Sequence, residues 1–215
     1  MKQYVENQQS GLPSELSEKL FEANAGPLAA RFPALASAIW HSPVAAVGAA
    51  QNGELTCKVL VDGTERLVHS AYEPSKEAEA QAELVPDTAK SVLCVGGGLG
   101  YLPVALLRRP EIKVVLVEPQ LPFLRAMLSL FDLRAALNEG RLVLMTASDL
   151  DISTLAEFAF PEEEVSHPVL GRLYAEPQRH FRYLTHLHGS RGRVLVVDNK
   201  LFVSDVAQVF EKRGF

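Results

Sequence analysis

SVLCVGGGLGY, at residues 91–101, is an apolar run that leads directly into a cluster of glycines. An ordered glycine costs backbone entropy, so a cluster placed after a buried strand indicates that something approaches the backbone closely. The pattern predicts a strand, a tight turn, and a helix whose N-terminus faces an open pocket. The glycines concerned are Gly96, Gly97, Gly98 and Gly100.

The spacing of these glycines restricts the ligand. A dinucleotide fingerprint that began at Gly96 would need its third glycine at position 101, where Tyr101 stands instead. A Walker A sequence would need Lys and then Ser or Thr after the last glycine, and neither is present. The loop therefore predicts a ligand edge that is not a polyphosphate.

From residue 91 onward, short apolar segments alternate with segments of helix length. Near-continuous apolar strands are buried on both faces, which is typical of a parallel sheet covered by helices. The pattern predicts an α/β fold with a doubly wound, mostly parallel, Rossmann-like sheet and ligands at the carboxyl ends of its strands. The expected strands are 91–95, 113–118, 141–145, a weaker 163–170, and 192–198, and the expected helices are 101–109, 121–137, 150–160 and 177–188.

The first 74 residues predict a small helical and β-hairpin module in front of a Rossmann-like domain at 75–215. A helix is expected in 12–26, capped by Ser14 and closed by Gly26 and Pro27. A second apolar segment, 27–40, is interrupted by Pro33. Asp62 and Gly63 stand between two strand-like runs, which predicts a two-residue hairpin, and 74–85 reads as a polar helix.

Two acidic residues follow the second and third predicted strands. Glu118 can accept hydrogen bonds from both hydroxyls of a ribose, and Asp149 from an exocyclic amine such as that of adenine. Each also has a structural interpretation, Glu118 as an acid at a helix N-terminus and Asp149 as part of an N-cap with Ser148. The glycine run alone can likewise serve close helix packing.

Taken in this order, these residues resemble the S-adenosylmethionine site of the class I methyltransferase fold, over about residues 85–215. The resemblance implies S-adenosylmethionine or another nucleotide as cofactor. The spacing of the cysteines and histidines does not suit a metal site, so no metal is expected. Methyl transfer would take place at the end of the fourth strand, where His167 is a weak candidate for a general base and the usual acceptor-positioning motif is missing. The implied cofactor-binding residues are Gly96, Gly97, Gly98, Gly100, Tyr101, Glu118, Pro119 and Asp149.

A second resemblance covers most of the chain. Asn24, Leu28 and RFPALASAI, then LVHSAYEPSKEAEAQ, then the glycine loop, follow one another as in the motility-accessory-factor family, also called DUF115 or MptE-like. That family is associated with flagellin glycosylation, is often joined to glycosyltransferase modules, and has archaeal relatives that are pterin diphosphokinases. The resemblance implies substrate-binding residues near the loop, although their spacing equally fits a capped surface helix: Ser70, Tyr72, Glu73 and Glu77.

Composition excludes several classes of partner. Hydrophobic residues make up 47% and charged residues 22%, with a formal net charge of -5, so there is no basic surface for nucleic acid. No apolar run approaches the roughly 18 residues of a membrane span, and the N-terminus lacks a signal peptide, which predicts a cytoplasmic protein. Cys57 and Cys94 are expected to be buried free thiols.

The expected last strand, 192–198, and the helix after it leave a methyltransferase-like sheet one strand short. We therefore expect a fragment of a longer protein, or an edge at 193–198 that pairs with another chain, a homo-oligomer included. Three functions remain open. They are a nucleotide-type ligand-binding domain in a glycosyltransferase-linked protein that modifies proteins or sugars, an active S-adenosylmethionine-dependent methyltransferase, and a degenerate scaffold domain. We expect no catalysis by this chain alone.

Overall fold

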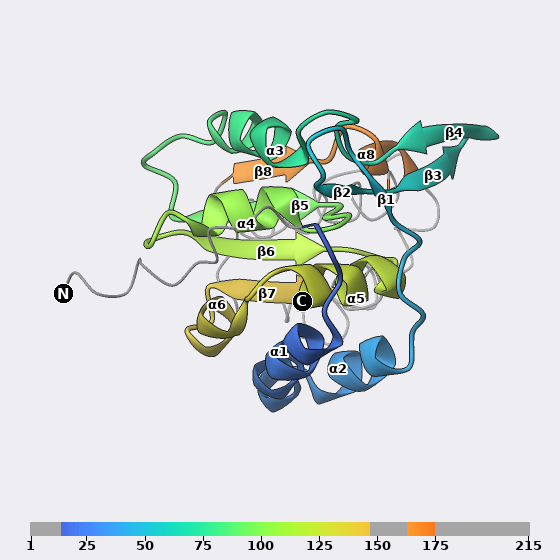
Figure 1. Cartoon of the computed structure of the whole chain (residues 1–215). Helices are drawn as coiled ribbons and strands as arrows, with labels where there is room; N and C mark the ends of the chain where they lie inside the picture. The colour runs from blue at the N-terminus through green and yellow to red at the C-terminus, as the bar shows by residue number, and fades with distance from the viewer. Residues whose placement is uncertain (1–13, 147–162, 175–215) are drawn as a thin grey trace, which may run out of the picture.

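The computed structural model of the protein describes residues 14–146 and 163–174. A four-stranded parallel sheet forms its centre (Figure 1). The order β7-β6-β5-β8 reverses direction at β5, the switch point of a doubly wound sheet, which confirms the predicted fold class. The strands are β5 (Ser91–Val95), β6 (Lys113–Val117), β7 (Leu142–Met145) and β8 (Glu163–Ser166). The expected elements at 150–160, 177–188 and 192–198 lie outside the described residues.

Helices connect the strands along one direction of the sheet. α4 (Tyr101–Leu107) follows β5, and α5 (Leu121–Leu130) and α6 (Arg134–Asn138) follow β6. They cover the same face, as right-handed crossovers in one direction require (Figure 1). The single helix expected over 121–137 is wrong, because Phe131 takes an extended backbone and divides it into α5 and α6. After β8 the chain turns into the short α8 (Leu170–Leu173).

The N-terminal helices differ from expectation in their boundaries. α1 (Glu18–Arg31) is capped by Ser17, whose Oγ accepts from Leu20 N at 3.2 Å, and not by Ser14. The helix continues through Gly26 and Pro27, because its buried face extends on both sides of them, with Phe21, Asn24 and Leu28 all nearly inaccessible. Pro33 does not interrupt a helix. It begins α2 (Pro33–Trp40), where the backbone N–H that proline lacks would have no partner within the helix.

Small β elements lie beyond the carboxyl ends of the central strands (Figure 1). β1 (Gly48–Ala49) pairs with β2 (Leu55–Thr56), and β3 (Lys58–Val61) pairs with β4 (Thr64–Leu67). The predicted hairpin is confirmed: Asp62 and Gly63 form its two-residue turn with φ of 51° and 74°, as a type I′ turn requires. The polar helix forms as α3 (Pro74–Ala82), which packs against α4.

One hydrophobic cluster joins the N-terminal elements to the sheet. It includes Phe21, Leu28 and Ile39 from the first two helices together with the residues of the central strands. The division of the chain at residue 74 stays a prediction, because this cluster spans it. Cys57 and Cys94 are free and buried, as predicted, and burial raises the pKa of each thiol to about 12. In the described ranges, no helix has the length and apolarity to cross a membrane.

Asn24 of α1 forms hydrogen bonds with the backbone groups at the break between α5 and α6. Its side chain is fully buried, and Nδ2 donates to the carbonyls of Leu128 and Phe131 at 2.8 and 2.7 Å. Its Oδ1 accepts from Leu133 N at 2.8 Å. Backbone groups left over at a helix break need partners when they are buried. Asn24 therefore has a structural role here.

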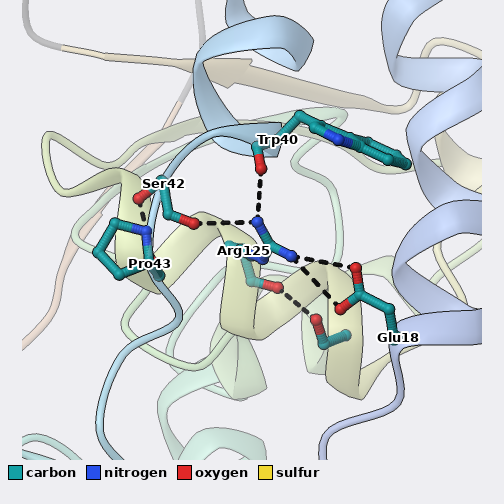
Figure 2. Close-up of polar contacts among 6 residues, drawn as sticks. Glu18, Trp40, Ser42, Pro43 and Arg125 are labelled. Atoms are coloured by element: carbon teal, nitrogen blue, oxygen red, sulfur yellow. Dashed lines mark hydrogen bonds and ion pairs between the residues drawn. The ribbon is translucent and has the colours of Figure 1, made fainter.

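Arg125 of α5 connects its helix to the start of α1 and the end of α2 (Figure 2). Its Nη2 contacts the Glu18 carboxylate at 3.0 Å, and its Nη1 donates to the carbonyls of Trp40 and Ser42. The guanidinium also lies 4.6 Å from the centre of the Phe21 ring. Since this side chain is only 17% exposed, its contacts are better protected from solvent than those of an ordinary surface ion pair.

We expect Asn24→Ala to destabilise the fold by about 2 to 4 kcal/mol, because it leaves three buried backbone groups without partners. Urea unfolding followed by circular dichroism measures the loss. Asn138→Ala at the exposed end of α6 is the matched control and should change the free energy of unfolding by less than about 0.5 kcal/mol. Equal losses in the two variants would contradict the structural role of Asn24.

Candidate functional site

The glycine loop joins β5 to α4 at the switch point of the sheet. Gly96, Gly98 and Gly100 have φ of 83°, 53° and 96°, a region that residues with a Cβ rarely adopt. Gly100 also packs tightly, since a Cβ there would lie 2.3 Å from Met127 Cγ. The predicted strand, turn and helix are therefore confirmed, and these three glycines are required by backbone conformation.

Side chains cover this loop on its outer side. All residues from 91 to 101 are buried. A Cβ at Gly96 would lie 2.8 Å from Leu170 Cβ. One at Gly98 would lie 2.7 Å from both His69 Nε2 and Val68 Cγ1. The expectation that the loop faces an open pocket is wrong for the described residues, because the end of β4 and the start of α8 occupy that space.

Glu118 lies directly after β6 and is fully buried. Its Oε2 accepts from the backbone N–H groups of Gly97 and Gly98 at 2.9 and 3.1 Å. Its Oε1 accepts from Gln120 N at 3.0 Å and from the phenol of Tyr174. A carboxylate has about four acceptor positions, so the described protein already fills the capacity of this one.

The environment of Glu118 sets its ionisation. Burial raises the pKa of this carboxyl, and the hydrogen bonds from its four donors oppose that rise. Burial and the neighbouring Glu118 carboxylate together raise the pKa of Tyr174, so its phenol stays protonated and donates. Tyr174 stands at the end of α8, and sequence reasoning missed it.

His69, beyond the end of β4, closes the loop from the hairpin side. Its Nε2 accepts from Leu99 N at 2.8 Å, which requires a ring with its proton on Nδ1. Burial, reinforced by His167, lowers the pKa of His69 well below its usual value. The ring also meets the edge of Tyr101 at a centroid distance of 4.9 Å, and the Tyr101 phenol donates to Leu55 O at 2.7 Å.

His167, the weak catalytic candidate, is 3% exposed at the end of β8. Its Nδ1 accepts from the backbone N–H groups of Val169 and Leu170, both at 3.2 Å, so this ring supports the turn into α8. Burial lowers the pKa of His167 to about 4. A catalytic role for it stays a prediction, and the described contacts give it a structural one.

The four substrate candidates lie at the start of α3. Ser70 Oγ accepts from the backbone N–H groups of Tyr72 and Glu73 at 3.1 and 3.2 Å. Glu77 Oε2 reaches back to Ser70 N at 2.8 Å, and Tyr72 is 62% exposed. These contacts order the turn that precedes α3, and the N-cap residue Glu73 forms no side-chain capping bond. A binding role for these residues stays a prediction.

A buried acid that was not predicted from the sequence, Glu54, contacts the first turn of α3. Glu54 is fully buried, and its carboxylate accepts from both the backbone N–H and the hydroxyl of Ser75 in the first turn of α3. An acid at a helix N-terminus is favourable to the helix. Of the other site candidates, Pro119 is half-buried and Asp149 lies outside the described residues. Among the described residues, no group of three or more His, Cys, Asp or Glu could hold a metal.

We expect Gly98→Ala to destabilise the protein by about 2 to 4 kcal/mol, because the methyl group meets His69 and Val68 and the backbone is left-handed. Gly26→Ala is the matched control. Gly26 lies in α1 with nothing within 4 Å of an added Cβ, so alanine there should be neutral or stabilise the helix by up to about 1 kcal/mol. Urea midpoints compare the two variants, and a tolerated Gly98→Ala would contradict the tight packing of the loop.

We expect stability to fall as the pH drops from about 6.5 towards 4. The unfolded chain protonates His69 and His167 in this range while the folded chain does not, so the unfolded state binds more protons. Each histidine contributes a slope of up to about 1.4 kcal/mol per pH unit. The raised pKa of Glu118 acts in the opposite direction, because the folded state then takes up its proton first.

Urea unfolding between pH 7.5 and 4.5 measures this slope. His167→Asn is the informative variant, since an amide oxygen can still accept from Val169 and Leu170 but does not titrate. Its pH slope should be shallower than that of the unaltered protein. Identical slopes would mean that His167 does not contribute.

Comparisons with known proteins identify the family of the chain. The profile described as "Glycosyltransferase Maf N-terminal domain" matches residues 20–142. The Maf glycosyltransferase from Magnetospirillum magneticum AMB-1 is similar in structure, at 19% sequence identity and a TM-score of 0.54. The match covers 77% of this chain and 35% of that chain, so the protein spans about a third of that enzyme's length.

Two further structures show a weaker likeness. The N-terminal domain of EvdMO1 with SAH bound has 25% identity and a TM-score of 0.28, over 39% of this chain and 34% of that one. TYW2 from P. horikoshii in complex with MeSAdo has 15% identity and a TM-score of 0.30, over 62% and 61%. No curated protein matches the chain. Because the family profile covers more than half of its residues, the protein belongs to the family of Maf glycosyltransferase N-terminal domains.

Proposed function

We propose that this protein is a non-catalytic structural domain of a Maf-type glycosyltransferase, in which its own side chains fill the nucleotide position of a Rossmann-like fold. One observation carries the proposal: the carboxylate of Glu118 has a donor for each of its acceptor positions and is fully buried. A ribose could reach it only by displacing one of those donors.

The other residues around the glycine loop support the same function. Val68 and His69 cover Gly98, and Leu170 covers Gly96. His167, which would be the base in a methyltransferase, accepts hydrogen bonds from the turn that it supports and has a pKa lowered to about 4. Within the described residues of this cluster, Glu118, His69 and His167 are all engaged in these contacts and are not available as a general base.

A second candidate is the nucleotide-type ligand-binding domain, with S-adenosylmethionine or another nucleotide as ligand and a protein or sugar as acceptor. The position of Glu118 favours it, since an acid after the second strand of such a sheet is where ribose hydroxyls bind. This function requires Tyr174 to leave the carboxylate and α8 to move from the loop. If the domain binds S-adenosylmethionine, methyltransferase activity is a further alternative. The cytoplasmic location stays a prediction.

Thermal unfolding in the presence of S-adenosylmethionine, S-adenosylhomocysteine, CMP, UDP or ATP tests the proposal. A ligand present at a hundred times its Kd would stabilise the fold by about 2.7 kcal/mol. For a chain of this size that corresponds to a rise in Tm of about 5 to 10 °C. We expect no such rise with any of the five compounds.

Two variants make the outcome specific. Glu118→Gln removes the carboxylate that a ribose would need, and Tyr174→Phe removes the phenol that occupies it. A rise in Tm that appears in the unaltered protein and is lost in Glu118→Gln would overturn the structural function and establish ligand binding. A rise that appears only in Tyr174→Phe would show that the tyrosine closes a binding site.

A further inference from the structure

The hairpin of β3 and β4 forms a two-stranded sheet of its own, beyond the carboxyl ends of the central strands (Figure 1). In the described part of the chain, β4 is the one strand that pairs with β3, so the second edge of β3 has no strand beside it. Two-stranded sheets are marginal in water, and a free strand edge is a template for pairing.

The hydrogen-bond register identifies which groups point to that edge. Val68 N donates to Cys57 O, so Cys57 faces β4. Facing alternates along a strand of an antiparallel pair, so Val59 and Val61 also bond towards β4. The backbone N–H and C=O groups of Lys58 and Leu60 therefore point to the free edge.

The surroundings leave room for another strand there. An open depression of about 470 Å³ lies beside β3. Three residues of β3 line it, and no residue of β4 does. Its lining is largely apolar and consists of Ala45, Ala46, Lys58, Val59, Leu60, Gln120, Pro122, Phe123 and Leu173. Leu60 is 66% exposed and Leu173 is 37% exposed at this place, a considerable cost for leucine side chains in water.

The sequence of β3 is complementary to itself. When two copies run antiparallel with the two-fold axis at Leu60, Leu60 faces its own copy, and Val59 faces the copy of Val61. In the same register Lys58 comes beside the turn residue Asp62 of the copy, while its Nζ also contacts Glu65 of its own β4 at 2.9 Å, so the amine lies near acidic groups of both copies. The outward groups of Leu60 and its copy then form a hydrogen-bonded pair.

We propose that β3 pairs with β3 of a second copy of this chain, so that β4 and β3 of the two copies form one continuous four-stranded antiparallel sheet. The contact is isologous and closes at two subunits. It covers Leu60 and fills the depression beside β3. The glycine loop itself takes no part in the contact, although Leu173 of α8 and Gln120 line the depression, and both Gln120 N and the phenol of the residue after Leu173 donate to Glu118.

Sedimentation equilibrium of the 215-residue chain tests the state of association. We expect a mass of twice the 23.5 kDa of one chain at high concentration. Leu60→Glu should weaken association at least tenfold, since it sets two carboxylates against each other at the axis. Leu67→Glu is the matched control, because Leu67 is 37% exposed on β4 of the same hairpin but away from the free edge, and it should leave association unchanged.

Disulfide formation tests the register. In a hydrogen-bonded antiparallel pair the two Cα atoms lie about 5.5 Å apart, within the range that a disulfide spans. Leu60→Cys should therefore form a disulfide-linked dimer under mild oxidation. Leu67→Cys should not, because its copy lies three strand spacings away across the sheet and is also offset along the strands, which places it more than about 14 Å away. The native thiols of Cys57 and Cys94 are buried and do not compete.

A single mass of one chain over the whole concentration range would overturn the proposal. The alternative partner for the β3 edge would then be a segment of the glycosyltransferase portion of a Maf-type protein. Association that Leu60→Glu does not weaken, or a failure of Leu60→Cys to cross-link while the chain is dimeric, would also overturn it and place the interface elsewhere.

Discussion

The buried carboxylate of Glu118 is the interaction on which the centre of this domain depends. A carboxylate without solvent is costly unless hydrogen bonds satisfy it. Here the donors come from three separate elements, namely the glycine loop, the turn into α5 and the end of α8. The same group therefore fixes how the loop turns, where α5 begins and where the chain lies after β8. Because its donors are backbone N–H groups and a phenol, no second charge needs to be buried with it.

The N-terminal helices are attached by a similar use of polar groups. Asn24 supplies partners to the backbone between α5 and α6, and Arg125 holds the end of α2 and the start of α1. Both side chains satisfy carbonyls of the element that they touch, so their contacts specify one arrangement and apolar packing of Phe21 and Leu28 adds to it. The segment around Asn24 thus determines how the first helix docks.

The central strands could be predicted from sequence because each is a short, continuous apolar run, and the hairpin because Asp62 and Gly63 suit only one kind of turn. The side chains that cover the glycine loop could not be predicted from sequence. Tyr174 is 56 residues from Glu118 in sequence and His69 is 30 from Leu99, so no local pattern pairs them. The predicted helix boundaries are wrong for the same reason. The buried face of α1 continues past the proline within it, and Asn24 supports the break between α5 and α6 from more than a hundred residues away in sequence.

The loop also shows why glycines in such a position are weak indicators of a ligand. Each of the three left-handed glycines is needed for the turn itself, and the space that a ligand would use at Gly96 and Gly98 is taken by Leu170, His69 and Val68. A phenol hydroxyl on Glu118 offers the carboxylate the same donor that a ribose hydroxyl would. A chain can therefore keep the glycines and the acid of a nucleotide site for internal packing alone. What separates the two cases is whether an acceptor position of the acid is left without a donor, and the described residues supply four donors to Glu118.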